Sequence, residues 1–311
     1  MNIVFFGSSE FAVESLNKLL LNKAYNILCV VTQPDKKQGR GLKLSHTLVK
    51  DAALKNKLNI YQPKTLRNPQ VISYLNNLNA DIFVVIAYGK ILPEELLKIP
   101  KVFSINLHAS LLPKYRGAAP INWAIINAEN ETGVSIIKMN PAMDAGEIIS
   151  QQKIAIKNDD TSVTLEKKLA VLGSNLLLQA LEAIANNKHQ LIKQDGAKIS
   201  LAPLMKKEDG LINWRLPAEN LYNLIRGCLD WPGAFTHLKE KTIKVWAAII
   251  DSKENADAQP GEIIRLSKEG ILVKTGKGNL LIKELQPESG KRMAADVFLQ
   301  GHKLKIGNKF I

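Results

Sequence analysis

The chain has 311 residues, of which 46% are hydrophobic and 23% are charged. This composition is typical of a soluble globular protein, and the length is roughly twice that of a common domain, so we expect two domains. Its two cysteines have no C-x-x-C spacing, which excludes a disulfide framework and indicates no metal site. The longest apolar runs, at 82–87 and 245–250, are far shorter than the roughly 20 residues that span a bilayer. We therefore expect a cytoplasmic protein with no membrane partner.

The net charge is the first functional indication in the sequence. A formal charge of +13 at pH 7 attracts polyanions, among them nucleic acids. A basic chain can equally reflect solubility alone. Charge by itself therefore leaves both interpretations open.

Short apolar runs alternate with segments of helical periodicity in the first half of the chain. This alternation is typical of βαβ units, and it predicts a Rossmann-like, doubly wound and mostly parallel α/β sheet. The expected strands are residues 2–6, 27–31, 82–87 and 102–107, and the expected helices between them are residues 10–21, 45–57 and 70–77.

The second half changes character. Acidic and hydroxyl residues at 159–162 suit a helix start, and the leucines that follow at helical spacing predict a helix to about Ala185. Residues 188–208 lose this periodicity and predict a linker. Beyond it, brief β-rich runs separated by glycine-containing turns predict a small OB-like β-barrel. The expected organisation is a catalytic domain at 1–188, a linker at 189–207 and a barrel domain at 208–311.

The first expected strand leads through Gly7 into a helix, as in a dinucleotide-binding fold. The G-x-G-x-x-G pattern needs three glycines, and this turn has one. A nicotinamide enzyme is therefore disfavoured, and Gly7 is better explained as the residue that permits a tight turn.

Two polar residues stand at the end of the expected buried strand at 102–107. Asn106 and His108 are two positions apart, which places both on one face of the strand. They also stand at its carboxyl end, where ligands of open α/β sheets bind. A single histidine there is more often structural, but the neighbouring amide favours a function. The following loop, at 114–120, is rich in glycine, proline and small residues and can bring backbone groups close to a flat heterocycle.

A second loop, at 139–147, carries Asp144 between a proline and a glycine. Alone, this aspartate resembles many surface carboxylates. With the strand residues it completes a set suited to acyl transfer. Asn106 can donate to an oxyanion, His108 can take a proton near neutral pH, and Asp144 can orient the imidazole.

The segment after the second strand is rich in cations. Lys36, Lys37, Arg40 and Lys43 occur in a loop that also contains two glycines. Flexible basic loops bind phosphate backbones. Without the other motifs, a solvated surface loop is the simpler interpretation of this segment.

Two long motifs resemble those of known formyltransferases. The run N-x-H-A-S-L-L-P-x-Y-R-G-A-A-P-I at 106–121 resembles the signature of folate-dependent formyltransferases, and MDAG at 143–146 resembles their second catalytic loop. These motifs are shared by a superfamily that includes enzymes acting on a purine precursor, on folate itself and on amino sugars. The loop departs from many relatives at Ala145 and Glu147, where Thr and Asp are common, which leaves the roles of these flanking residues open.

Three further features resemble the methionyl-tRNA formyltransferase family in particular. The QPD run at 33–35 and the GRG run at 39–41 resemble the basic insertion loop that this family lays against the tRNA acceptor end. The WPGAF run at 231–235 resembles part of its OB-like carboxyl domain. The chain length agrees as well, and the likeness extends from Met1 to the end.

The resemblance implies transfer of the formyl group of 10-formyl-tetrahydrofolate to the amine of initiator methionyl-tRNA, by direct attack, in a monomer without a metal. It implies three sets of residues: catalytic Asn106, His108 and Asp144; folate-binding Ser110, Leu111, Leu112 and Pro113; and tRNA-binding Lys36, Lys37, Arg40 and Lys43.

Two alternatives remain open at this point. The first is an amino-sugar formyltransferase that uses the same folate, although a small substrate would not need the basic loop. The second is an RNA-binding protein that has kept the scaffold without the activity, against which the intact Asn106, His108 and Asp144 argue.

Overall fold

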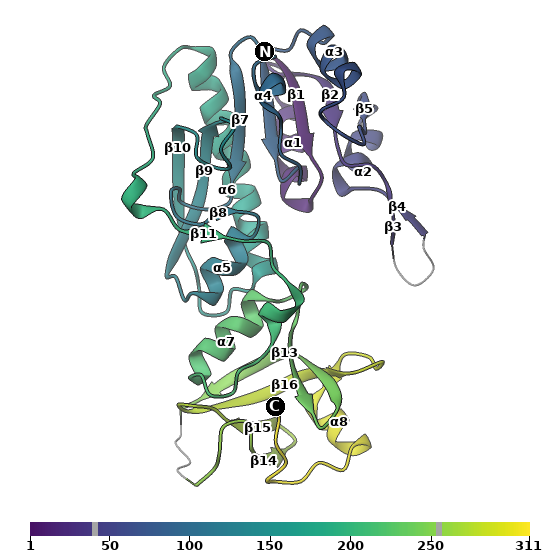
Figure 1. The fold of residues 1–311 in the computed structure, drawn as a ribbon, viewed down its shortest axis with the longest axis vertical. Coiled ribbons are helices and arrows are strands. Elements are labelled where there is room, and N and C mark those ends of the chain that lie inside the picture. The colour runs from purple at the N-terminus through teal and green to yellow at the C-terminus, as the bar shows by residue number, and fades with distance from the viewer. Residues whose placement is uncertain (39–42, 253–256) are drawn as a thin grey trace. The chain divides into compact units, whose positions relative to one another are not determined.

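The computed structural model describes residues 1–38, 43–252 and 257–311, and it describes residues 37, 38 and 43 by their backbone alone. The chain forms two compact units, which are described separately (Figure 1). The amino-terminal unit comprises Met1–Pro120, Glu131–Ala155 and Glu166–Pro203. The carboxyl-terminal unit comprises Ile121–Asn130, Ile156–Leu165 and Leu204–Ile311.

A seven-stranded sheet forms the centre of the amino-terminal unit, in the order β10-β9-β7-β6-β1-β2-β5. The strands from β5 to β7 are parallel, and β9 and β10 continue the sheet in antiparallel orientation. The predicted doubly wound, mostly parallel sheet is thus confirmed. Its strands are β1 (Asn2–Gly7), β2 (Asn26–Val31), β5 (Ile60–Tyr61), β6 (Ile82–Ile86), β7 (Phe103–His108), β9 (Glu131–Lys138) and β10 (Ile148–Ala155).

Both faces of the central strands are buried, which explains why these strands read as continuous apolar runs. On one face, Val4 and Phe6 of β1 pack with Val71 of α3 and Leu96 of α4. The alternate residue Phe5 is also fully buried. The helices of this unit are α1 (Glu10–Leu21), α2 (Leu48–Lys55), α3 (Pro69–Asn77), α4 (Glu94–Leu97) and most of α6 (Ser162–Ala185).

Helix α6 ends at Ala185, as the leucine spacing predicts. By length and composition alone this 24-residue helix could cross a membrane, and half of its most apolar window is buried within the protein. Gly173 brings it close to β7, because a Cβ atom at that position would lie 2.8 Å from Cδ2 of Leu107. Close packing against the sheet accounts for the apolar composition of the helix.

Short elements complete the amino-terminal unit. The basic segment forms an antiparallel hairpin of two three-residue strands rather than an irregular loop. A second two-stranded pair joins residues 116–117 to residues 201–202 in parallel. These elements are β3 (Lys36–Gln38), β4 (Lys43–Ser45), β8 (Arg116–Gly117), β11 (Leu201–Ala202) and the 3₁₀ turn η1 (Gly196–Lys198).

The carboxyl-terminal unit contains an antiparallel sheet in the order β12-β13-β16-β15-β14, with β17 beside β16. The last residues of the chain bridge both edges of this sheet, since Phe310 pairs with Leu238 and Lys309 pairs with Glu262. This bridging closes the sheet into the small barrel that the sequence predicts. Its strands are β12 (Ala234–Leu238), β13 (Lys241–Asp251), β14 (Ile263–Ser267), β15 (Gly270–Lys274), β16 (Asn279–Pro287) and β17 (Met293–Ala294).

Helices cover part of this barrel. Leu221 and Ile225 of α7 are buried in one core with Ile243 and Val245 of β13. The buried Arg226 donates to the carbonyl oxygen of Asp160 at 2.8 Å and so ties α7 to the segment before α6. The remaining elements are α5 (Pro120–Ile126), α7 (Ala218–Gly227), α8 (Ala295–Gly301) and η2 (Lys207–Gly210).

Candidate active site

Strand β7 places Asn106 and His108 together at the carboxyl edge of the sheet. Phe6 pairs with Val85 and Val85 pairs with Asn106 in parallel register, so these three side chains share one face. The strand ends at His108, two residues further on the same face. The strand order reverses between β1 and β6, because β2 and β5 follow on one side of β1 and β6 and β7 follow on the other. Ligands of open α/β sheets usually bind at such a reversal.

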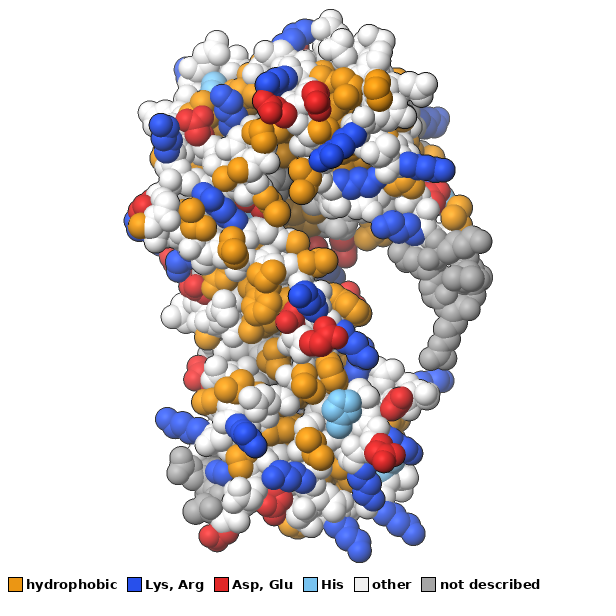
Figure 2. All heavy atoms as spheres, viewed as in Figure 1, with side chains coloured by type: hydrophobic (Ala, Val, Ile, Leu, Met, Phe, Trp, Pro, Cys, Tyr) orange, Lys and Arg blue, Asp and Glu red, His pale blue; other side chains and the backbone are white. Residues whose placement is uncertain are grey.

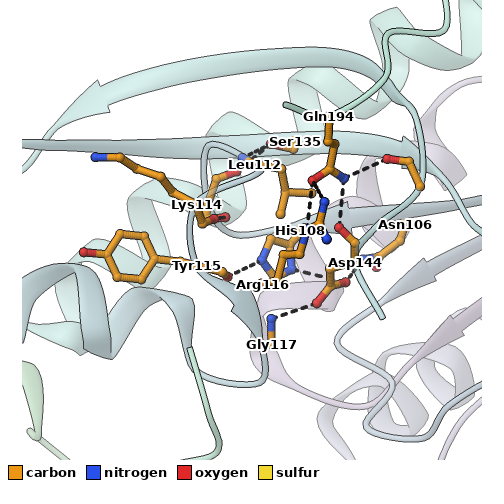
Figure 3. Close-up of polar contacts among 12 residues, drawn as sticks. Asn106, His108, Leu112, Lys114, Tyr115, Arg116, Gly117, Ser135, Asp144 and Gln194 are labelled. Atoms are coloured by element: carbon orange, nitrogen blue, oxygen red, sulfur yellow. Dashed lines mark hydrogen bonds and ion pairs between the residues drawn. The ribbon is translucent and has the colours of Figure 1, made fainter. Parts of the chain in front are cut away.

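Asp144 reaches the same place from the loop between β9 and β10. Its carboxylate oxygen Oδ1 accepts a hydrogen bond from Nδ2 of Asn106 at 3.2 Å, and Oδ2 accepts the N–H of Gly117 at 2.9 Å. Nδ1 of His108 lies 3.6 Å from Oδ1, with both side chains at least 87% buried. The three residues singled out in the sequence therefore form one cluster (Figure 3), which we call the Asn–His–Asp cluster.

The imidazole of His108 has a fixed donor side. Its Nε2 lies 2.9 Å from the carbonyl oxygen of Tyr115, and a carbonyl oxygen can only accept, so Nε2 carries the hydrogen. Tyr115 holds this carbonyl in place with a left-handed backbone, φ +60°. Nδ1, which faces Asp144, is then the nitrogen that can gain and lose a proton.

The loop after His108 is fixed by hydrogen bonds within the protein. Ser135 Oγ donates to the carbonyl oxygen of Ser110 at 2.6 Å and accepts the N–H of Leu112 at 3.1 Å. Gln151 Nε2 donates to the carbonyl oxygen of Leu112 at 2.8 Å. Ser110 and Leu112 are thus buried and engaged internally, while Leu111 and Pro113 are half-buried. The loop has a rigid backbone directly beside the Asn–His–Asp cluster.

The loop after β6 lies next to β7 and is irregular. Ala87 and Gly89 have left-handed φ values of +43° and +77°. Between them, the carbonyl oxygen of Tyr88 accepts Nε2 of Gln33 at 2.9 Å. Burial raises the pKa of the Tyr88 hydroxyl to about 12, so this group stays neutral over the physiological range.

Two further residues of the polar network around Asp144 were not identified from the sequence. Gln194 donates from Nε2 to the carbonyl oxygens of Asp144 and Gly146, at 2.8 and 2.7 Å. Arg116 donates from Nε and Nη2 to Oε1 of Gln194, at 3.0 and 2.7 Å. Arg116 belongs to the motif at 106–121, but the motif alone indicates no role for it. Gln194 lies where periodicity is absent, within the expected linker, so no local pattern indicates it.

Gly146 anchors the other end of the Asp144 loop. A Cβ atom there would lie 1.8 Å from the carbonyl oxygen of Lys138 in β9, far inside contact distance. We therefore expect Gly146→Ala to displace the loop and to lower turnover about 10²-fold, the cost typical of a misplacement of about 1 Å. Steady-state kinetics with a thermal unfolding curve measures this effect. Gly196→Ala is the control, because nothing lies within 4 Å of a Cβ atom at that position. Wild-type turnover of Gly146→Ala would contradict the expectation.

The base of the basic hairpin is held by polar contacts. Asp35 accepts hydrogen bonds from Gln62 at 2.8 Å and from Lys50 at 2.6 Å, and these bonds lower the pKa of its carboxyl group. Lys36 Nζ donates to Oε1 of Gln33 at 3.0 Å. Of the other expected tRNA-binding residues, Lys37 and Lys43 are described by their backbone alone, and Arg40 lies outside the described residues.

No group of three or more His, Cys, Asp or Glu side chains placed to hold a metal ion occurs within residues 1–38, 43–252 and 257–311. The polar side chains of the Asn–His–Asp cluster are one amide, one imidazole and one carboxylate. This set can donate to an oxyanion, carry a proton and stabilise positive charge on the imidazole.

Solved structures share the fold. An N-formyltransferase from Helicobacter canadensis, in complex with folinic acid and dTDP-3-aminofucose, superposes with a TM-score of 0.67 at 20% sequence identity and covers 94% of this chain and 99% of its own. HypX from Aquifex aeolicus, in complex with tetrahydrofolic acid, has a TM-score of 0.64 at 14% identity and covers 98% of this chain and 50% of its own. At these identities the similarity concerns the fold.

Family models and curated relatives are more specific. The formyl transferase model matches residues 1–181, and the model of the formyl transferase carboxyl-terminal domain matches residues 204–303. The methionyl-tRNA formyltransferase of Acetivibrio thermocellus is 42% identical over 307 residues, which are 99% of this chain and 98% of that protein. That of Caldanaerobacter subterraneus is 44% identical over 99% of both chains. With matches of this length and identity, the chain belongs to the methionyl-tRNA formyltransferase family.

Proposed function

We propose that this protein transfers the formyl group of 10-formyl-tetrahydrofolate to the free amine of initiator methionyl-tRNA. The observation that carries the proposal is the Asn–His–Asp cluster at the carboxyl edge of the sheet, in a chain whose full-length relatives are named for this reaction. The experiment is an assay of formyl transfer with charged initiator tRNA, with a dTDP-amino sugar as the competing acceptor. If only the sugar is formylated, the protein is a sugar formyltransferase and the proposal is wrong. If neither acceptor is formylated, the alternative of an RNA-binding protein without this activity is favoured.

The chemistry needs no enzyme nucleophile. The amine attacks the formyl carbon, a new C–N bond forms, and the carbonyl oxygen becomes an oxyanion. Asn106 uses one N–H for Asp144 and has a second N–H that can donate to this oxyanion. His108 takes the proton of the amine on Nδ1, and Asp144 stabilises the resulting imidazolium. The bond from the formyl carbon to the folate nitrogen then breaks, and that nitrogen takes the proton from the His108 imidazolium, which returns the imidazole to its neutral form.

The loops around the cluster fit a folate. The folate supplies the activated formyl group, and its flat pterin ring needs backbone donors and acceptors. The loops at 110–113 and 139–144 border the cluster, and the irregular loop at 86–89 follows β6 beside β7. The N–H and carbonyl oxygen of Leu112 are bonded within the protein, so we expect the 110–113 loop to support the pterin as a rigid wall while other backbone groups make the hydrogen bonds. We assign folate binding to these three loops, with Ser110, Leu111, Leu112 and Pro113 as the central segment.

Charge supports a polyanionic acceptor. Lys and Arg side chains are spread over the visible surface of each unit (Figure 2). We propose that Lys36, Lys37, Arg40 and Lys43 of the hairpin bind the acceptor stem and that residues 208–311 form a tRNA-binding domain. We further propose that the protein acts as a cytoplasmic monomer.

The hairpin proposal predicts a change in salt dependence. Each phosphate contact on duplex contributes about −0.9 to the slope of log K against log salt concentration, so the Arg40→Gln, Lys43→Gln double variant should lose nearly two units of slope. Filter binding of tRNA between low and moderate salt measures it. The matched control is Lys55→Gln, Lys57→Gln, which removes two exposed cations elsewhere in the same unit. An unchanged slope in the hairpin variant would exclude it from the interface.

A further inference from the structure

The segment at 190–202 contacts both loops that complete the Asn–His–Asp cluster. Gln194 contacts the Asp144 loop, and Oγ of Ser200 accepts the N–H of Tyr115 at 2.9 Å. Strand β11 at the end of the segment pairs with β8 beside Tyr115. Tyr115 and Asp144 both have left-handed backbones, with φ of +60° and +51°. The segment therefore holds two strained positions on which the cluster depends.

The side chain of Gln194 uses its full hydrogen-bonding capacity. An amide has two N–H donors and two acceptor lone pairs. Both N–H groups point to carbonyl oxygens, of Asp144 and Gly146, and the oxygen accepts two bonds from Arg116 (Figure 3). The amide has one possible orientation, because reversing it would place Oε1 against two carbonyl oxygens and the NH₂ group against the guanidinium.

The contact to Asp144 opposes a backbone cost. A left-handed conformation is disfavoured for a residue with a Cβ atom. This conformation directs the carboxylate towards Asn106 and the Gly117 N–H while its own carbonyl oxygen faces Gln194. Hydrogen bonds from a charged donor are stronger than neutral ones, and they polarise the group that accepts them. Arg116 therefore strengthens the two bonds that Gln194 donates.

We propose that Gln194, held by Arg116, is a positioning residue that fixes the backbone of Asp144 so that its carboxylate meets Asn106 and His108. The expected effect of Gln194 on the rate rests on the proposed function, whereas its expected effect on the loop rests on geometry alone. Gln194 lies outside both sequence motifs and acts from a segment 50 positions further along the chain.

The first test is the isosteric variant Gln194→Glu. Its carboxylate keeps an attraction to Arg116 but replaces the NH₂ group, which supplies both N–H donors, with an oxygen that faces two carbonyl oxygens. We expect kcat to fall about 10²-fold, with KM for methionyl-tRNA unchanged. Gln194→Met, which is neutral and similar in volume, should also lower kcat and leave KM unchanged. It takes the place of the glutamate variant if that variant folds poorly. The matched control is Gln190→Glu, an exposed position on the same segment with the same chemical change, which should retain wild-type kinetics.

A double-mutant cycle separates positioning from a general structural role. If Gln194 acts through Asp144, then Gln194→Glu should change single-turnover rates little in an Asp144→Asn background. An equal loss in both backgrounds would overturn the proposal.

Amide exchange tests the loop without substrate. The Gly117 N–H donates to Asp144, so its exchange should accelerate in Gln194→Glu and stay slow in Gln190→Glu. Unchanged protection of Gly117 in Gln194→Glu would also overturn the proposal. If the wild-type protein does not formylate methionyl-tRNA, the proposed function fails while this measurement still decides whether Gln194 positions Asp144.

Discussion

Replacement of His108 by glutamine is expected to lower kcat about 10²- to 10⁴-fold, the range over which a general acid–base group contributes, and to leave the Kd for methionyl-tRNA unchanged. The reason lies in the two sides of the imidazole. Nε2 donates to the carbonyl oxygen of Tyr115, a contact that a glutamine amide can replace. Nδ1 faces Asp144 and exchanges the proton, a task that an amide cannot perform.

The pH dependence of single-turnover rates distinguishes proton transfer from positioning. The amine of the substrate has a pKa of about 7.7–8.0 or lower, so one ionisation belongs to the substrate in every variant. We expect the pH profile of His108→Gln to follow the substrate amine alone and to differ from that of the wild-type protein. The matched control is His189→Gln, in the same unit, where the ring packs edge-on against Phe103. A wild-type pH profile in His108→Gln would show that the imidazole is not the proton carrier.

The parts of the fold that were predictable are those where burial produces a pattern. Strand β1 appears in the sequence as a continuous apolar run because both of its faces are buried, and helix α6 appears because its apolar residues repeat with the helical period. Asn106 and His108 were identifiable as polar residues at the carboxyl end of a buried strand. Apolar patterning does not report strand direction, so the antiparallel orientation of β9 and β10 came from the structure.

The parts that were not predictable depend on contacts between distant residues. Strands β3 and β4 have three residues each and a single apolar residue, the exposed Leu44, which is too little to produce periodicity. Gln194 is polar and half-buried in a segment without regular structure, and its partners become visible only when the chain is folded. A candidate catalytic residue can therefore be predicted where it interrupts a core element, whereas a residue that contacts it from an irregular segment cannot.

Replacement of Asn106 by alanine is expected to reduce kcat about 10²- to 10³-fold, the usual cost of losing one oxyanion donor, with tRNA affinity unchanged. The amide has two N–H groups. One donates to Asp144 at 3.2 Å, and the second can serve the oxyanion, so alanine removes a support for the carboxylate together with the donor.

A second substitution separates these two contributions. Asn106→Asp keeps the shape of the side chain, removes both donors and places a carboxylate beside Asp144, where like charges disfavour ionisation of both. If oxyanion donation is what matters, Asn106→Asp should be at least as impaired as Asn106→Ala across the whole pH range. If the amide mainly supports Asp144, the aspartate variant should become more active than Asn106→Ala at the same low pH, where one of its two carboxyls is protonated and can donate to the other. Single-turnover rates measured against pH decide between the two, with Asn76→Ala on the exposed surface of α3 as the control. Turnover of Asn106→Ala within about tenfold of wild type would remove Asn106 from the oxyanion site, because the loss of one such donor costs more than that.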